Sequence, residues 1–115
     1  MNVTTEFSKG LAIVRVGETR LMYPMLADFS ATVSSLIARG EKKLIIDLTP
    51  VTYVDSATIG CFMDLYRQAT AANATLKLGG VQKRVETMLT MTGAQNFLEI
   101  HPDEPSALKS FGALS

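Results

Sequence analysis

Three consecutive apolar residues, Leu44-Ile45-Ile46, constrain the fold of this chain more than any other feature. Successive side chains of a strand point to opposite faces of a sheet, so an unbroken apolar run suits a strand covered on both faces. The run lies within the segment 43–48, and segments with helical spacing of apolar residues flank it in the sequence. We therefore expect 43–48 to be a central strand of a sheet that carries packed helices.

The rest of the chain alternates between strand and helix patterns. The other expected strands are 3–7 and 11–16, which form a hairpin around Ser8-Lys9-Gly10, and 75–78 and 97–100. The expected helices are 25–39, 56–72, 81–91 and a final helix that opens at 102–105. This alternation with short connections predicts one α/β domain, residues 1–115, with parallel neighbouring strands.

Apolar spacing also predicts how the helices are placed. The expected buried face of helix 25–39 consists of Leu26, Phe29, Val33, Leu36 and Ile37. That of helix 56–72 consists of Ile59, Phe62, Met63 and Tyr66. We expect these two helices to cover one face of the sheet. Helix 81–91 and the final helix are expected to close the ends of the sheet or to join the same layer, and the segment 17–24 is expected to be irregular.

Composition excludes several classes of function. Eleven basic residues balance eleven acidic ones, whereas nucleic-acid binding needs a clustered basic surface. The lone Cys61 cannot form an internal disulfide and suits a position in or near the core. The N-terminus does not resemble a secretory signal, and no apolar run approaches the roughly 20 residues that span a bilayer. We expect a cytoplasmic protein with no membrane insertion.

Residues that could carry catalysis or hold a cofactor are sparse. The single histidine, His101, precedes a proline and is expected in an exposed loop. Gly79-Gly80 lacks the lysine of a phosphate-binding loop, and no Cys/His spacing suits zinc. Asp47 is interpreted as a turn residue whose side chain accepts from nearby backbone N–H groups. We expect no enzymatic activity, no metal and no cofactor.

The segment 47–60 carries the most specific local pattern. It reads as the end of a buried strand, a turn, a second short apolar run, and then the pair Asp55-Ser56, which opens a helix. A helix N-terminus stabilises negative charge, so a serine hydroxyl there suits modification by phosphate. From the residues alone, the more frequent role of Ser56 is that of an N-cap.

The same segment resembles the signature of the STAS family, which includes the bacterial anti-sigma-factor antagonists. The matching residues are Asp47, Leu48, Thr49, Val51, Val54, Asp55, Ser56 and Gly60. Similarity continues on both sides, from Val14-Arg-Val-Gly17-Glu18 to Leu89-Thr-Met-Thr92-Gly93, and so covers nearly the whole chain. The resemblance implies a mixed five-stranded sheet with about four helices.

The resemblance also implies a mechanism of partner switching. Ser56 would be the phosphorylation site, and Asp55, Ser56, Ala57, Thr58 and Arg20 would contact the partner. That partner would be a GHKL-type serine kinase that acts as an anti-sigma factor. It would bind the unphosphorylated chain and release it once Ser56 is phosphorylated, and a PP2C-type phosphatase would reverse the modification.

Two positions depart from the family pattern. Thr58 and Ile59 stand where the pattern has Gly-Leu, and Thr58 adds a second possible hydroxyl acceptor. Arg20 stands where the pattern has an aspartate, and either offers a cation for a phosphate or is an ordinary surface residue. The alternative function is therefore a STAS subunit that is not phosphorylated, either in an ABC lipid-transport complex or in a stress-signalling scaffold.

Overall fold

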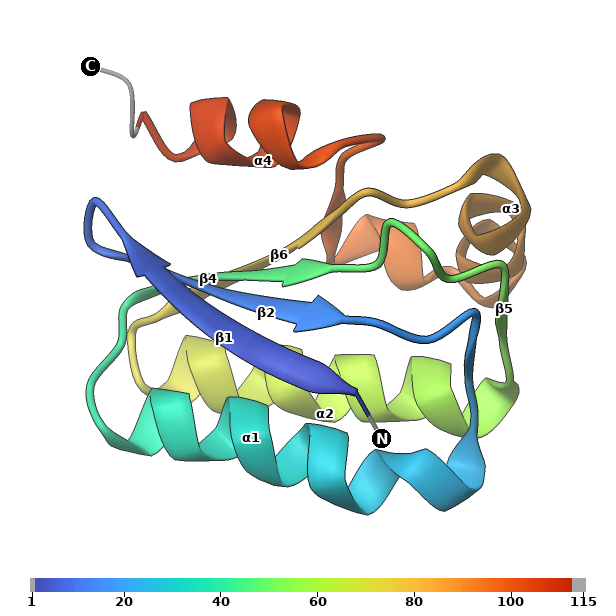
Figure 1. The fold of residues 1–115 in the computed structure, drawn as a ribbon, viewed down its shortest axis with the longest axis horizontal. Helices are drawn as coiled ribbons and strands as arrows, with labels where there is room; N and C mark the ends of the chain where they lie inside the picture. Colours follow the sequence, from blue (N-terminus) through green and yellow to red (C-terminus); the bar gives the residue numbers. More distant parts are fainter. Residues whose placement is uncertain (1, 113–115) are drawn as a thin grey trace.

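A mixed five-stranded sheet forms the centre of the protein in this computed structural model, which describes residues 2–112 (Figure 1). Its strands are β1 (Val3–Ser8), β2 (Leu11–Val16), β4 (Lys43–Asp47), β6 (Thr75–Gly79) and β7 (Glu99–Ile100), in the order β1-β2-β4-β6-β7. Only the β1–β2 pair is antiparallel. The strand with the apolar run, β4, is the middle one, as predicted, and Leu44, Ile45 and Ile46 are all fully buried.

Helices α1 (Leu26–Ala38) and α2 (Ser56–Ala71) cover one face of this sheet side by side, as predicted (Figure 1). The main hydrophobic core lies between this helix layer and the sheet. The rings of Phe29 on α1 and Phe62 on α2 meet edge to face with centroids 5.9 Å apart, and neither side chain is exposed. This geometry is favourable for aromatic pairs and fixes the two helices against each other.

The last helix, α4 (Glu104–Ser110), covers the opposite face of the sheet (Figure 1). Our expectation that it closes an end or joins the α1–α2 layer is therefore wrong. A small second core forms beneath α4 from Leu11, Ile13, Ile45 and Ala107. The strands β2 and β4 thus bury side chains on both faces, and α4 covers the face that α1 and α2 leave open.

Charged and polar contacts hold α4 alongside this small core. Glu104 accepts from Arg15 on β2, with Nη2 2.9 Å from Oε1. At the other end of the helix, the ammonium of Lys77 on β6 lies 2.8 Å from the hydroxyl of Ser110 and 4.3 Å from the ring centroid of Phe111. Polar groups from the sheet therefore contribute much of the contact with α4.

Helix α3 (Lys83–Thr92) lies at the end of the sheet beside the short strand β5 (Tyr53–Val54) (Figure 1). Its buried residues Val85 and Leu89 belong to the main core. It ends at Gly93 with a positive φ of 80°, the left-handed conformation that glycine adopts at low cost.

Several boundaries differ from the predicted ones. The segment expected to be irregular contains the two-residue strand β3 (Arg20–Leu21), which pairs in parallel with β5, and the single turn η1 (Tyr23–Met25). The last strand begins at Glu99 because η2 (Ala94–Asn96) occupies the chain before it.

Two expectations about burial also need correction. The buried face of α2 consists of Thr58, Ile59, Phe62, Leu65 and Ala69. Met63 and Tyr66, which we expected there, are only partly buried. On α1, Leu26 is likewise only partly buried. His101 is not the solvent-exposed residue that we expected, because its side chain is only 17% exposed and its Nε2 lies 2.5 Å from Glu99 Oε2.

Candidate functional site

The loop between β4 and α2 is shaped by the side chain of Asp47. Its carboxylate accepts from the backbone N–H of Thr49 at 3.0 Å and from the Thr49 hydroxyl at 2.5 Å. Gly80 packs against this turn with a φ of +66°, and a Cβ on it would overlap the Thr49 hydroxyl oxygen. Asp47 therefore has the turn-forming role predicted for it, and the turn directs the chain into β5 and then α2.

Asp55 is the residue that caps α2. It has extended backbone angles, and its Oδ1 accepts from the backbone N–H of Thr58 at 2.9 Å. Its other oxygen, Oδ2, accepts from the backbone N–H of Tyr23 at 2.9 Å. The suggestion that Ser56 is the N-cap is therefore wrong: Ser56 is the first residue of the helix. One carboxylate holds the start of α2 and ties it to the turn η1.

These contacts also set the ionisation of Asp55. Partial burial raises the pKa of its carboxyl group, but the hydrogen bonds from the Thr58 side chain and from the backbone of Tyr23 and Thr58 together outweigh that effect. The resulting pKa lies below the ordinary value of 3.8. Because these hydrogen bonds stabilise the charged form, Asp55 is a carboxylate at neutral pH.

Thr58 lies in the interior of the protein. Its side chain is fully buried, and its hydroxyl lies 2.8 Å from the carbonyl oxygen of Leu21 and 2.6 Å from Asp55 Oδ1. A kinase cannot reach a hydroxyl in this position while the domain is folded. The geometry therefore argues against Thr58 both as a second acceptor and as a surface that contacts a partner.

By contrast, the outer side of the same helical turn is open. Ser56, Ala57 and Gly60 are all exposed. A Cβ built on Gly60 would meet no atom within 4 Å, so packing within the domain does not require glycine there. The first turns of α2 thus present a hydroxyl flanked by residues with small side chains or none.

Arg20 lies close to this region in the fold. It is exposed on β3, and its guanidinium carbon lies 5.3 Å from the ring centroid of Tyr53 on β5, two residues before Asp55. This is the range of a cation–π contact. The structure therefore brings all five predicted site residues, which are Arg20, Asp55, Ser56, Ala57 and Thr58, to the same end of α2, with Thr58 beneath the surface.

The family model described as the STAS domain matches residues 2–107. The chain belongs to the STAS domain family. A STAS anti-sigma-factor-antagonist domain protein from Planctomyces limnophilus superimposes with a TM-score of 0.85 and 14% identity, covering 98% of each chain.

Two further STAS-like structures extend the comparison. An anti-sigma factor antagonist from Mycobacterium paratuberculosis has a TM-score of 0.82 and 15% identity over 95% of this chain and 92% of that one. The Bacillus cell fate determinant SpoIIAA in its phosphorylated form has a TM-score of 0.72 and 15% identity over 96% and 99%. At such identities the likeness shows a shared STAS fold.

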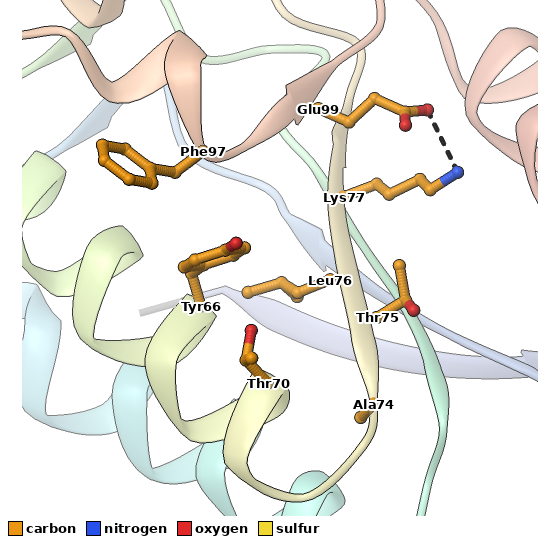
Figure 2. Close-up of a pocket in the computed structure, with 8 residues that line it drawn as sticks. All are labelled: Tyr66, Thr70, Ala74, Thr75, Leu76, Lys77, Phe97 and Glu99. Carbon is orange, nitrogen blue, oxygen red and sulfur yellow. Dashed lines mark ion pairs between the residues drawn. The ribbon is translucent and has the colours of Figure 1, made fainter.

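A hollow of about 240 Å³ lies elsewhere on this STAS domain, between the last turns of α2 and the β6–β7 edge of the sheet (Figure 2). Tyr66 and Phe97 lie next to each other on one side of it, with ring centroids 6.2 Å apart. Its one cation, Lys77, is paired with Glu99 at 3.0 Å. This charge is thus already neutralised, and the hollow lies at the opposite end of α2 from Ser56.

Residues 2–112 form neither a metal-binding cluster nor a membrane-spanning helix. No cluster of three or more His, Cys, Asp or Glu side chains in this part of the chain is arranged to hold a metal ion. None of its helices has the length and apolar character needed to cross a membrane.

Sequence reasoning missed two participants in the site. Tyr23 and Leu21 contribute backbone groups that bind Asp55 and Thr58, and any residue type carries such groups. The sequence therefore holds no signal for them. Gly60 already belongs to the signature matched in the sequence, and the structure adds that it faces outward on α2.

Proposed function

We propose that this STAS protein is an anti-sigma-factor antagonist that acts by partner switching. It binds a kinase-type anti-sigma factor while Ser56 is unphosphorylated and is released when Ser56 carries a phosphate. The observation that carries the proposal is the position of Ser56, exposed at the first residue of α2 directly after the capping Asp55. The side chain of Ser56 is exposed, whereas the neighbouring hydroxyl of Thr58 is buried.

The local electrostatics suit a switch that leaves the fold intact. A phosphate on Ser56 adds about −1.5 to −2 charges at a helix N-terminus, where the unpaired N–H groups and the dipole favour negative charge. The carboxylate of Asp55 stands one residue away and opposes it. The phosphorylated domain thus stays folded, while a partner docked on α2 meets a concentrated negative charge that it must desolvate.

Gly60 supports the use of this helix turn as a docking surface. Glycine inside a helix costs roughly 0.5–1 kcal/mol relative to alanine, and nothing in the domain fills the space that a Cβ would take. Close approach of a second protein is a use that offsets this cost. Together with the exposed Ala57, Gly60 leaves room for a partner's backbone beside Ser56.

The partner in this proposal is a GHKL-type serine kinase, which binds the nucleotide itself. The antagonist contributes the hydroxyl and no catalytic group, so it is not an enzyme. A PP2C-type phosphatase restores the unphosphorylated form. All three proteins meet in the cytoplasm, where sigma factors act, and release of a sigma factor follows when the antagonist occupies the kinase.

Phosphorylation with the cognate kinase and ATP tests the proposal directly. Fragment mass spectrometry should place one phosphate on Ser56, and the modified protein should lose affinity for the kinase. Ser56→Ala should bind the kinase without being labelled, and Ser56→Asp should bind weakly. Thr52→Ala removes an exposed hydroxyl a few residues away and serves as the matched control, which should behave as wild type.

The result that would replace this proposal is equally specific. The protein is a constitutive subunit if neither Ser56 nor Thr58 is phosphorylated and a stable ATPase partner co-purifies with both wild type and Ser56→Asp. In that case the alternative role, in an ABC lipid-transport complex or a stress-signalling scaffold, takes precedence.

A further inference from the structure

The free edge of the sheet at β1 has an orderly arrangement of unpaired backbone groups. The N–H of Gly17 donates to the carbonyl of Asn2 at 2.7 Å, and these two residues continue the β1–β2 register in which Val3 faces Val16. Bonding toward the partner alternates along an antiparallel ladder. The residues that turn their N–H and C=O groups toward β2 are therefore Asn2, Thr4, Glu6 and Ser8, and those that turn them outward are Val3, Thr5 and Phe7.

The side chains of the outward-bonding residues lie on the α1 side of the sheet. Val3 packs against the main core. Thr5 and Phe7 line an open groove of about 390 Å³ together with Ala31, Thr32, Ser35, Leu36 and Arg39 of the α1 region. Phe7 is 53% exposed there, and β1 lies at the margin of the sheet above α1 (Figure 1).

We propose that two copies of this chain associate by antiparallel pairing of their β1 strands around a two-fold axis at Thr5. In that register Thr5 faces its own copy, and Val3 faces Phe7 of the second copy on both sides of the axis. These are the same three residues whose backbone groups point outward. Every group on the exposed edge from Val3 to Phe7 is thereby paired, and each of the three facing pairs exchanges two hydrogen bonds.

Side chains on β1 are complementary in this register. The apolar pair Val3 and Phe7 meets twice, on the face that carries the groove, so the exposed Phe7 ring gains an apolar neighbour. On the opposite face, Glu6 stands across from Thr4 of the second copy. The single acidic residue of β1 therefore does not face itself, which avoids the repulsion that like charges cause when directly opposed.

A row of polar residues on α1 and at its C-cap shares the same symmetry. Thr32, Ser35 and Arg39 line the groove at helical spacing, and Asp28 continues their row one turn earlier, beyond the groove. A two-fold axis midway between Thr32 and Ser35 brings Asp28 of one copy toward Arg39 of the other, twice. Because Thr5 borders the groove beside Thr32 and Ser35, one axis serves both the strand and the helix. This charge complementarity favours a second copy as the occupant of the edge.

Sedimentation equilibrium of the full chain over a wide range of concentrations tests the pairing. Wild type should show a reversible monomer–dimer equilibrium. Thr5→Pro removes an N–H that bonds only across the interface, at an edge position where proline is tolerated. It should raise the dimer dissociation constant about tenfold or more, since each dimer loses two hydrogen bonds. Thr4→Val keeps every outward group and should dimerise as wild type.

Charge exchange provides a second test that does not depend on how proline affects folding. Asp28→Arg and Arg39→Asp should each weaken the dimer, and the double variant should recover most of the loss. Circular dichroism checks that each variant keeps its helices and strands. A wild type that stays monomeric at all concentrations would overturn the proposal. A dimer insensitive to Thr5→Pro and to both single charge variants would overturn it as well.

Discussion

The buried hydroxyl of Thr58 should contribute measurably to stability. It lies within hydrogen-bonding distance of the Leu21 carbonyl and of Asp55, and no part of the side chain is exposed. Thr58→Val removes the hydroxyl while keeping the β-branched shape, so helix propensity changes little. A buried partner left without its hydrogen bond costs about 1–3 kcal/mol. We expect the free energy of unfolding to fall by that amount.

Urea denaturation followed by circular dichroism measures this loss. With a slope of about 1–3 kcal/mol per molar for a small domain, the midpoint should fall by roughly 1 M while the slope is unchanged. The matched control is Thr52→Val, which removes an exposed hydroxyl that donates to the Thr19 carbonyl at 3.1 Å. Surface changes of this kind stay within about 0.5 kcal/mol. Equal losses in the two variants would refute the argument that burial gives the Thr58 hydrogen bonds their value.

Outcomes are expected for four further variants. Phe62→Ala should lower the free energy of unfolding by about 3–5 kcal/mol in a denaturant titration, because the ring is fully buried against Phe29. The pKa of the Asp55 carboxyl group is lowered from 3.8 in the folded protein. Its stabilising effect is therefore present above pH 3.8 and is lost as the pH falls through the folded-state pKa. The free energy of unfolding should fall less steeply with acid in Asp55→Asn than in wild type. Gly80→Ala should lower the free energy of unfolding by at least about 1–2 kcal/mol in the same denaturant titration, because its φ is +66°. Gly60→Ala should raise the free energy of unfolding by roughly 0.5–1 kcal/mol.

Local periodicity was sufficient to predict the main layers of the fold. The apolar run of β4 identified the central strand, and the spacing of Phe29 and Val33 identified the buried face of α1. Each of these patterns lies within a single strand or helix, and the observed fold buries the residues that the pattern predicts to be buried. The placement of α4 depends instead on which face of β2 and β4 remains uncovered, and that is decided by the arrangement of the other helices.

The details of the site were harder to predict for a similar reason. Aspartate and serine are both good N-caps, and the choice of Asp55 over Ser56 is favoured by the Tyr23 N–H, which comes from a distant part of the chain. The burial of Thr58 likewise depends on β3 lying over the start of α2. Two-residue strands such as β3 carry too short a pattern to be recognised from sequence.

Because α4 covers only a small apolar core and depends on polar contacts for part of its attachment, it forms the region of the domain most easily opened. Only Ala107 of this helix is fully buried, and the Arg15–Glu104 pair and the Lys77–Ser110 contact supply much of the rest. Amide protons of α4 should therefore exchange with solvent through local opening, and added salt should speed that exchange. Amides of α1 and α2 should exchange only when the whole domain unfolds. Opening of α4 would uncover Leu11 and Ile13 on a face of the sheet remote from the start of α2.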